Sequence, residues 1–246
     1  MDENAQHLLF TDGSSLGNPG PGGWGTIVVR SSERVIEMGG GEQHTTNNRM
    51  ELLALIEGLR HLEKAKGDVV ICLDSSYVHK GATQWSHAWI KNGWQTKAKK
   101  DVENRDLWER LLPLLAGRKK VGKVAWKHLP GHSGIAGNER ADEIATGFAK
   151  GDDVPLFKGE LGKYDVDILN ITVDDKVALK RSADRAHSRA KAYSYLSLVD
   201  GRVLRHLSWV DCEKHVIGKA GARYKKALSP SDESAILKAW GVRVFP

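Results

Sequence analysis

The sequence predicts an α/β domain, in which a mixed five-stranded sheet is flanked by helices, followed by a small α+β domain. Short apolar runs typical of strands alternate with segments of helical spacing in the order β-β-β-α-β-helices-β-α, which indicates helices packed on a mixed sheet. After a stretch with little periodicity, the pattern returns near the C-terminus. We therefore expect domains at 1–150 and 191–246, joined by a linker at 151–190.

The first predicted elements are three strands. An apolar run at 8–10 is followed by a Gly- and Pro-rich turn at 18–23, a second strand at 26–30 and a third around 34–39. Together they would form an antiparallel meander.

The rest of this domain is predicted to alternate between helix and strand. Thr45 to Asn48 provide N-cap chemistry for a helix with apolar residues at 52, 55, 56 and 59, which ends near Gly67. The later elements are expected at 69–73 (strand), 75–116 (mainly helical), 121–129 (strand) and from about Asn138 (last helix).

The C-terminal domain is predicted from a hairpin signal. Asp200-Gly201 separates the apolar runs 193–199 and 202–207, a spacing typical of a two-residue β-turn. The further elements are expected from Ser208 (short helix), at 222–228 (strand) and from Ser229-Pro230 to Gly241 (final helix).

Composition and charge limit the class of protein. The 246 residues are 40% hydrophobic and 28% charged, which is ordinary globular composition. Apolar runs such as 69–73 are far below the roughly 20 residues that cross a bilayer, and Asp2 and Glu3 do not fit a signal peptide, so we expect no membrane partner. Cys72 and Cys212 support neither a disulfide framework nor a cysteine zinc site, which favours the reducing cytoplasm. The net charge of +6 suits a polyanionic partner.

Four acidic residues stand at the ends of predicted elements. Asp12 and Asp74 follow strands, Glu51 lies in a first helical turn, and Asp142 lies near the start of the last helix. Singly, each has an ordinary explanation as a turn, strand-end or helix-dipole residue. Together they could converge at one edge of the sheet, where close carboxylates repel one another and a divalent cation is the natural partner. Two such ions can support an in-line displacement at phosphorus.

These acids stand within a series of ordered motifs. The series comprises Thr11-Asp12-Gly13-Ser14 with 17–23, then 46–52, then 74–78, and finally 131–134 with 137–143. From residue 7 to about 148 it resembles bacterial ribonuclease HI. The resemblance implies hydrolysis of the RNA strand of RNA/DNA hybrids, leaving 5′-phosphate and 3′-hydroxyl ends. It also implies two Mg²⁺ ions, or Mn²⁺ in their place, held by Asp12, Glu51, Asp74 and Asp142. We expect a monomer without a small-molecule cofactor.

The resemblance also implies roles for polar residues near the acids. His132 would assist proton transfer or product release, although a histidine in a Gly-rich turn needs no such role. The residues expected to contact the minor groove, sugars or phosphate are Asn18, Thr46, Asn47, Asn48 and Ser76, the last in a position where the family usually has glutamine.

Residues 85–100 resemble the basic protrusion with which this family grips the DNA strand. Trp94 and Lys97 would supply an aromatic face and a positive charge for sugar and phosphate. An amphipathic helix with a solvated lysine face is the alternative.

A second resemblance covers the C-terminal domain. Residues 208–212, 216–218 and 221–226 resemble the hybrid-binding domain shared with caulimovirus viroplasmin, which usually precedes the nuclease. By that resemblance Trp209 and Tyr224 would pack on DNA sugars, and Lys225 and Lys226 would hold phosphates, which favours repeated cutting of one duplex. Alternatively, both aromatic residues belong to the core of the domain.

Two other functions stay open at this point. A related metal-dependent nuclease on the same fold would cleave duplex DNA, whereas a non-catalytic protein that has kept the fold would bind hybrids without cleaving them. The presence of all four acids argues against the second. Cleavage assays on RNA/DNA, RNA/RNA and DNA/DNA duplexes would discriminate the three.

Overall fold

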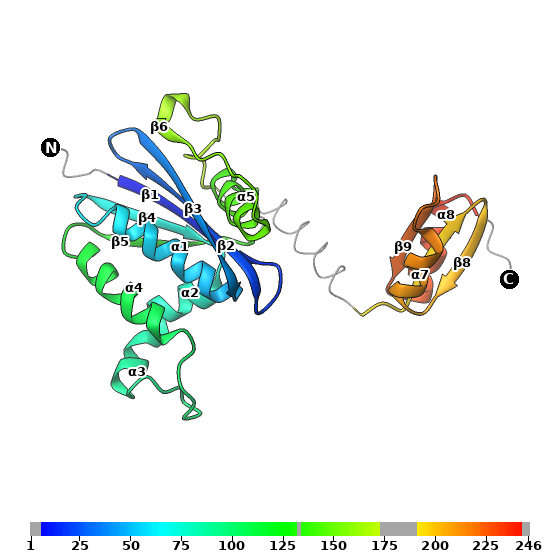
Figure 1. The fold of residues 1–246 in the computed structure, drawn as a ribbon, viewed down its shortest axis with the longest axis horizontal. Helices are drawn as coiled ribbons and strands as arrows, with labels where there is room; N and C mark the ends of the chain where they lie inside the picture. Colours follow the sequence, from blue (N-terminus) through cyan, green and yellow to red (C-terminus); the bar gives the residue numbers. More distant parts are fainter. Residues whose placement is uncertain (1–5, 132–133, 173–190, 243–246) are drawn as a thin grey trace. The chain divides into compact units, whose positions relative to one another are not determined.

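The computed structural model describes residues 6–131, 134–172 and 191–242 (Figure 1). The chain divides into two compact units, Met1–Ala178 and Leu179–Pro246. Among the described helices, none combines the length and the apolar character that crossing a membrane requires.

A mixed sheet forms the centre of the first unit. Its strand order is β5-β4-β1-β2-β3-β6. Strand β1 pairs in parallel with β4, and β4 with β5, whereas β1, β2, β3 and β6 pair antiparallel in succession. The strands are β1 (Gln6–Ser15), β2 (Gly20–Arg30), β3 (Arg34–Thr45), β4 (Asp68–Leu73), β5 (Val124–His128) and β6 (Lys158–Glu160). The predicted α/β class and mixed sheet are confirmed, with one strand more than expected.

Helices cover both faces of this sheet (Figure 1). Helix α1 (Asn47–His61) begins at the N-cap Thr46, whose hydroxyl accepts a hydrogen bond from the Arg49 N–H, and packs with α4 (Arg105–Arg118) on one face. Helix α5 (Ala136–Lys150) covers the other face. The remaining helical segments are α2 (Ser76–Lys80), the π-helical turn η1 (Gly81–Trp85), α3 (Ser86–Lys91) and the 3-10 turn η2 (Leu161–Lys163).

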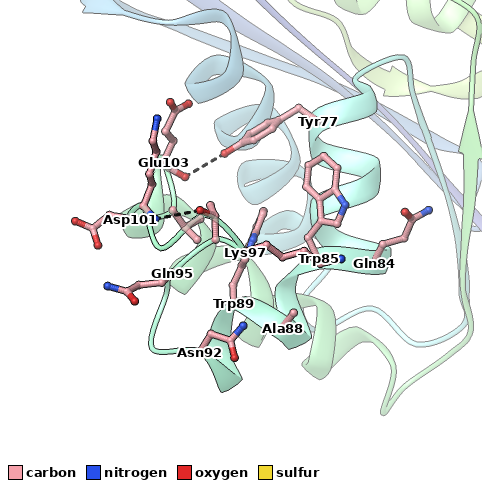
Figure 2. A pocket seen from close by; sticks show the side chains of 13 residues that line it. Tyr77, Gln84, Trp85, Ala88, Trp89, Asn92, Gln95, Lys97, Asp101 and Glu103 are labelled. Carbon is pink, nitrogen blue, oxygen red and sulfur yellow. Dashed lines mark hydrogen bonds between the residues drawn. The ribbon is translucent and has the colours of Figure 1, made fainter.

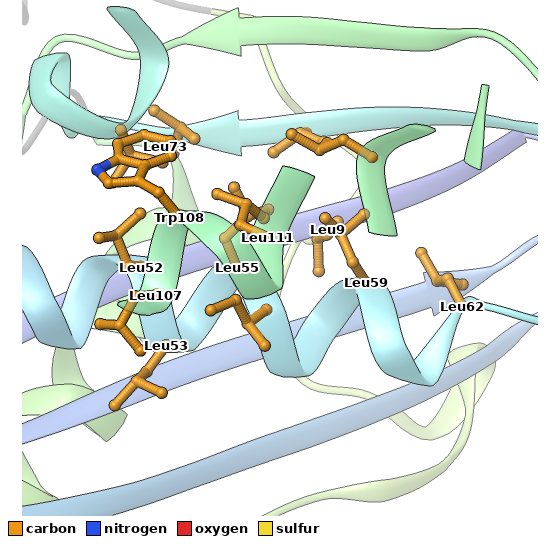
Figure 3. Close-up of a cluster of buried hydrophobic side chains, with 14 of the residues drawn as sticks. Leu9, Leu52, Leu53, Leu55, Leu59, Leu62, Leu73, Leu107, Trp108 and Leu111 are labelled. Atoms are coloured by element: carbon orange, nitrogen blue, oxygen red, sulfur yellow. The ribbon is translucent and has the colours of Figure 1, made fainter. Parts of the chain in front are cut away.

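The two faces of the sheet hold separate apolar clusters. Leucines of α1 meet Leu9 and the fully buried Trp108 of α4 in the first cluster (Figure 3). Phe10, the next residue of β1, points into the second cluster with Ile144 of α5. Because side chains alternate along a strand, covering both faces explains why β1 and β4 are continuous apolar runs.

The segment expected to be a linker differs from that prediction in its first half. Residues 158–160 form β6 on the edge of the sheet, paired with β3. Val154, Phe157 and Tyr164 pack against the second cluster, and Ile168 is buried within it. These apolar residues are spaced without a strand or helix period, which is why the sequence pattern does not reveal them.

The second unit is a three-stranded antiparallel sheet with two helices. Its strand order is β8-β7-β9, and Leu196, Ala227 and Ile236 form its core. Asp200 and Gly201 both have positive φ, as a two-residue hairpin turn requires. The elements are β7 (Ser194–Val199), β8 (Arg202–His206), α7 (Trp209–Val216), β9 (Arg223–Ala227) and α8 (Pro230–Ala239), close to the predicted ranges.

Candidate functional site

Three carboxylates converge where β1, β4 and α1 meet. One oxygen each of Asp12, Glu51 and Asp74 lies within 4.8 Å of the other two. The parallel pairing of β1 and β4, with Phe10 opposite Cys72, places the ends of these strands at the same edge of the sheet. The structure therefore brings together three of the four acids that the sequence singles out.

Gly13 allows β1 to reach the first turn of α1. A Cβ atom at this position would lie 2.2 Å from the Glu51 nitrogen and 2.6 Å from the Met50 carbonyl carbon. Backbone contacts of this kind leave no room for a side chain. Because Gly13 has no side chain, β1 approaches the first turn of α1 closely enough to place Asp12 beside Glu51.

Burial and mutual repulsion make this cluster electrostatically unfavourable on its own. Burial, followed by the charges of Asp74 and Asp142, raises the pKa of Asp12 well above its usual range. Burial, then the charges of Asp12 and Asp74, does the same to the pKa of Glu51. Among the residues that the structure describes, no group donates a hydrogen bond to the buried Glu51 Oε2 atom. A divalent cation would stabilise a buried carboxylate of this kind beside other carboxylates.

Asp142 lies near the three acids but outside their closest group. It sits on α5, half-buried, and its charge raises the pKa of both Asp12 and Glu51. The Thr146 hydroxyl lies 3.4 Å from Asp142 Oδ1 and 3.3 Å from the Ser14 hydroxyl at the end of β1. The position of the Asp142 carboxylate therefore depends on how α5 packs against the sheet.

Amide side chains connect the neighbouring loop to the cluster. The Asn18 Oδ1 atom accepts a hydrogen bond from the Asn47 N–H at 3.3 Å, and the Asn47 Nδ2 group donates to Glu51 Oε1 at 3.3 Å. Thr46 is the N-cap of α1, and Asn48 is half-buried in its first turn. These residues therefore do have cap and turn roles in the structure. Asn18 and Asn47 are nevertheless exposed beside the acids.

A histidine that was not among the predicted site residues lies next to the Asp74 backbone. The His128 Nε2 atom lies 3.1 Å from the Ser76 hydroxyl and 3.2 Å from the Asp74 carbonyl oxygen. Its ring stacks on that of His79, with 5.2 Å between the ring centroids. The feature of the sequence that could have indicated His128 is its position at the end of β5, the strand next to β4. His132 lies outside the described residues.

A pocket of about 630 Å³ lies under the protrusion formed by η1, α3 and the following loop. Figure 2 shows Tyr77 and Trp85 on one side of it and Gln95 and Asp101 on the other. Lys97 is an exposed residue of its lining. Trp94 is instead half-buried against the core, with the Arg105 guanidinium 5.4 Å from the centroid of its ring. The structure therefore gives Trp94 a packing role as well as its predicted place on the protrusion.

The second unit carries an exposed aromatic group. Trp209 is 38% exposed and Tyr224 is 55% exposed, with ring centroids 5.3 Å apart. Tyr195 lies 5.8 Å from Trp209 on the other side. Lys225 and Lys226 follow Tyr224 in β9. Trp209 and Tyr224 are accordingly surface residues of this unit, not core residues.

The first unit is similar to known proteins over most of its length. The family model described as RNase H matches residues 4–150. A ribonuclease H of Neisseria gonorrhoeae is 50% identical over 138 residues, which cover 56% of this chain and 91% of that protein. A ribonuclease HI of Neisseria meningitidis serogroup A is 51% identical over 143 residues, covering 58% and 94%. The crystal structure of LC9-RNase H1, a type 1 RNase H with the type 2 active-site motif, superposes with a TM-score of 0.53 and 30% identity, covering 65% of this chain and 80% of that one.

Proposed function

This chain belongs to the ribonuclease H family, and we propose that it hydrolyses the RNA strand of RNA/DNA hybrids. The reaction would use divalent metal ions held by Asp12, Glu51, Asp74 and Asp142. The observation that carries the proposal is the convergence of three carboxylates within 4.8 Å. Carboxylates that meet in this way could hold the ions that the proposed reaction requires.

The donor set fits Mg²⁺. All the converging ligands are carboxylate oxygens, which this hard cation prefers over nitrogen or sulfur. The buried Glu51 Oε2 atom has no hydrogen-bond partner within residues 6–131, 134–172 and 191–242, so a cation would satisfy it at the same time as it neutralises the repulsion. Mn²⁺ prefers the same ligands and would substitute. When bound, a pair of such ions would supply a water nucleophile of lowered pKa and charge stabilisation at the scissile phosphate.

The chain's own residues would then bind and orient the substrate. Asn47 holds Glu51 through its side-chain amide and is itself placed by Asn18. Exposed amides beside the cluster can hydrogen-bond to ribose 2′-hydroxyls, which DNA lacks. We therefore assign Asn18, Thr46, Asn47 and Asn48 to reading the RNA strand, together with Ser76 at the start of α2. His132 would receive or supply a proton during product formation.

The products would carry 5′-phosphate and 3′-hydroxyl ends. Attack of water on phosphorus in line with the 3′-oxygen breaks the bond from phosphorus to that oxygen, which leaves as the 3′-hydroxyl after protonation. The phosphate stays on the 5′-oxygen of the next nucleotide.

The second unit would bind the same hybrid and promote processivity. Exposed Trp209 and Tyr224 offer faces against which sugars or bases can pack, and Lys225 with Lys226 would contact phosphates. The net positive charge supports a polyanionic partner. A second binding site on the same chain raises the effective concentration of substrate and so favours repeated cuts.

Cleavage of three matched duplexes tests this function. With Mg²⁺ present, the full chain should cut the RNA strand of an RNA/DNA hybrid and leave RNA/RNA and DNA/DNA duplexes of the same sequence intact, and Asp12→Asn should remove the activity. Cutting of DNA/DNA would favour the related DNA nuclease. Binding of the hybrid without any cleavage would favour the non-catalytic alternative.

A further inference from the structure

We propose that residues 152–171, the extension, are a positioning element that seats α5 and thereby sets the place of Asp142 beside the three converging acids. The inference rests on the proposed function, because it assigns a task to Asp142 in that site. Three independent contacts carry it, and each joins the extension to α5 or to the sheet beneath it.

The first contact is a buried carboxylate shared by the sheet, α5 and the extension. The Glu37 side chain, in β3, is only 1% exposed. Its Oε1 atom accepts hydrogen bonds from Arg140 Nε at 2.8 Å and the Tyr164 hydroxyl at 2.6 Å. Its Oε2 atom accepts from Arg140 Nη2 at 2.9 Å and the Phe157 N–H at 2.8 Å. One carboxylate thus ties both the extension and α5 to the sheet.

The Arg140 guanidinium also contacts the extension directly. Its Nη2 group donates to the Pro155 carbonyl oxygen at 2.9 Å. Arg140 stands two residues before Asp142 on α5. The hydrogen-bond network therefore acts within one helical turn of the fourth acid.

The second and third contacts are apolar and lie towards the two ends of α5. A Cβ atom on Gly137 would lie 2.7 Å from Ile168 Cδ1 and from the Phe10 ring. A Cβ atom on Gly147 would lie 2.5 Å from Val154 Cγ2. Helix α5 has glycine at the two positions where the extension approaches it. Ile168 and Val154 therefore fill space that a side chain of α5 would otherwise occupy.

Asp142 lies between these fixed points. Gly137 is five residues before it and Gly147 five residues after it, so a tilt of α5 would move the Asp142 carboxylate relative to Asp12 and Glu51. Ile168 and Phe10 both approach Gly137 and belong to the same apolar cluster, and Phe10 precedes Asp12 by two residues in β1. Asp12, Glu51 and Asp74 stand on or next to β1, α1 and β4, so the packing of α5 is the variable that the extension controls.

The test compares variants of the full chain by Mn²⁺ binding, followed by electron paramagnetic resonance, together with steady-state kinetics on the hybrid. Ile168→Ala should weaken Mn²⁺ binding and raise the Mg²⁺ concentration for half-maximal activity by roughly 10-fold, a typical loss when groups that orient metal ligands are removed. The KM for the hybrid should not change. Ile168→Val removes only the Cδ1 atom that approaches Gly137, so it should weaken Mn²⁺ binding by a smaller factor than Ile168→Ala. Lys163→Ala, an exposed change in the same segment, should match the parent chain.

A second variant distinguishes a loss of positioning from a general destabilisation of the fold. Tyr164→Phe keeps the ring against Phe157 but removes one hydrogen bond from Glu37, and it should weaken Mn²⁺ binding in the same direction by a smaller factor. Parent-like Mn²⁺ affinity in Ile168→Ala and Tyr164→Phe would overturn the positioning role, even with a lowered melting temperature. A parent chain that neither binds Mn²⁺ nor cleaves hybrids would instead overturn the proposed function.

Discussion

Asp12 and Glu51, which are 39 positions apart in the chain, place carboxylate oxygens within 4.8 Å of one another in buried surroundings. Burial, followed by the charges of neighbouring carboxylates, raises the pKa of both side chains well above the usual range. Ionising these groups therefore destabilises the metal-free protein, and the proposed divalent cations would offset that cost.

Asp12→Asn should stabilise the metal-free protein while abolishing hybrid cleavage. The folded-state pKa of Asp12 lies above its unfolded value, so its ionisation destabilises the fold as pH rises from about 4 through the folded pKa. A gain of about 1 kcal/mol at pH 7 would raise the melting temperature by roughly 2–4 °C. Calorimetry in EDTA should show a larger gain at pH 8 than at pH 5. The exposed Asp152→Asn serves as control, and a melting temperature lowered by Asp12→Asn would contradict this account.

Gly13→Ala should reduce hybrid cleavage by about 100-fold, because the added methyl group must push β1 away from the first turn of α1 and misplace the ligands. Single-turnover rates at saturating hybrid measure the effect. Gly117→Ala is a matched control: nothing lies within 4 Å of its Cβ position on α4, so this change should leave cleavage intact and stabilise the protein by roughly 0.5–1 kcal/mol. Equal activity of the two variants would refute the close-approach role of Gly13.

Glu37→Gln should destabilise the first unit in a pH-dependent way. Burial alone would raise the pKa of Glu37, but hydrogen bonds from Arg140, Tyr164 and the Phe157 N–H hold that pKa below its ordinary value. Its contribution is thus present above the unfolded pKa of about 4.3 and is lost as pH falls through the lower folded pKa. Breaking this buried pair should cost about 3 kcal/mol in unfolding free energy at pH 7.

Urea titrations at several pH values measure this effect. The difference between the parent chain and Glu37→Gln should be largest above about pH 5 and shrink towards pH 3. The exposed pair of Glu160 with Lys163 offers a contrast, since Glu160→Gln should cost below about 1 kcal/mol at any pH. A difference that stays constant with pH would exclude an ionised Glu37 as its source.

Lys225→Ala combined with Lys226→Ala should weaken hybrid binding and flatten its salt dependence by about one to two units of log–log slope, because fewer phosphate contacts release fewer counterions. Trp209→Ala should cost roughly 1–3 kcal/mol of binding with the salt slope unchanged, as expected for stacking. Fluorescence anisotropy with a labelled hybrid measures both. Single-turnover cleavage at saturating hybrid should stay unchanged in both variants, and an unaltered affinity would argue against a binding role for the second unit.

The strand and helix order was predictable because β1 and β4 are continuous apolar runs and the apolar residues of α1 follow the helical period. Turn and cap residues such as Gly201 and Ser208 mark the boundaries. The places of Asp12, Glu51 and Asp74 at element ends made their convergence possible, and the resemblance to ribonuclease HI implied it. The extension was missed, since Val154 and Ile168 find their partners across space without local periodicity. The contact of His128 with the Asp74 backbone likewise depends on the pairing of β4 and β5, which one sequence does not specify.

The most direct test of the account is single-turnover cleavage of an end-labelled RNA/DNA hybrid by the parent chain and by Asp12→Asn, each with Mg²⁺ and with EDTA. We predict RNA fragments with 3′-hydroxyl ends from the parent chain with Mg²⁺, and cleavage lower by at least about 10³-fold in the other three reactions. Comparable cleavage by Asp12→Asn, or by the parent chain in EDTA, would show that the converging carboxylates do not hold the ions on which hydrolysis depends.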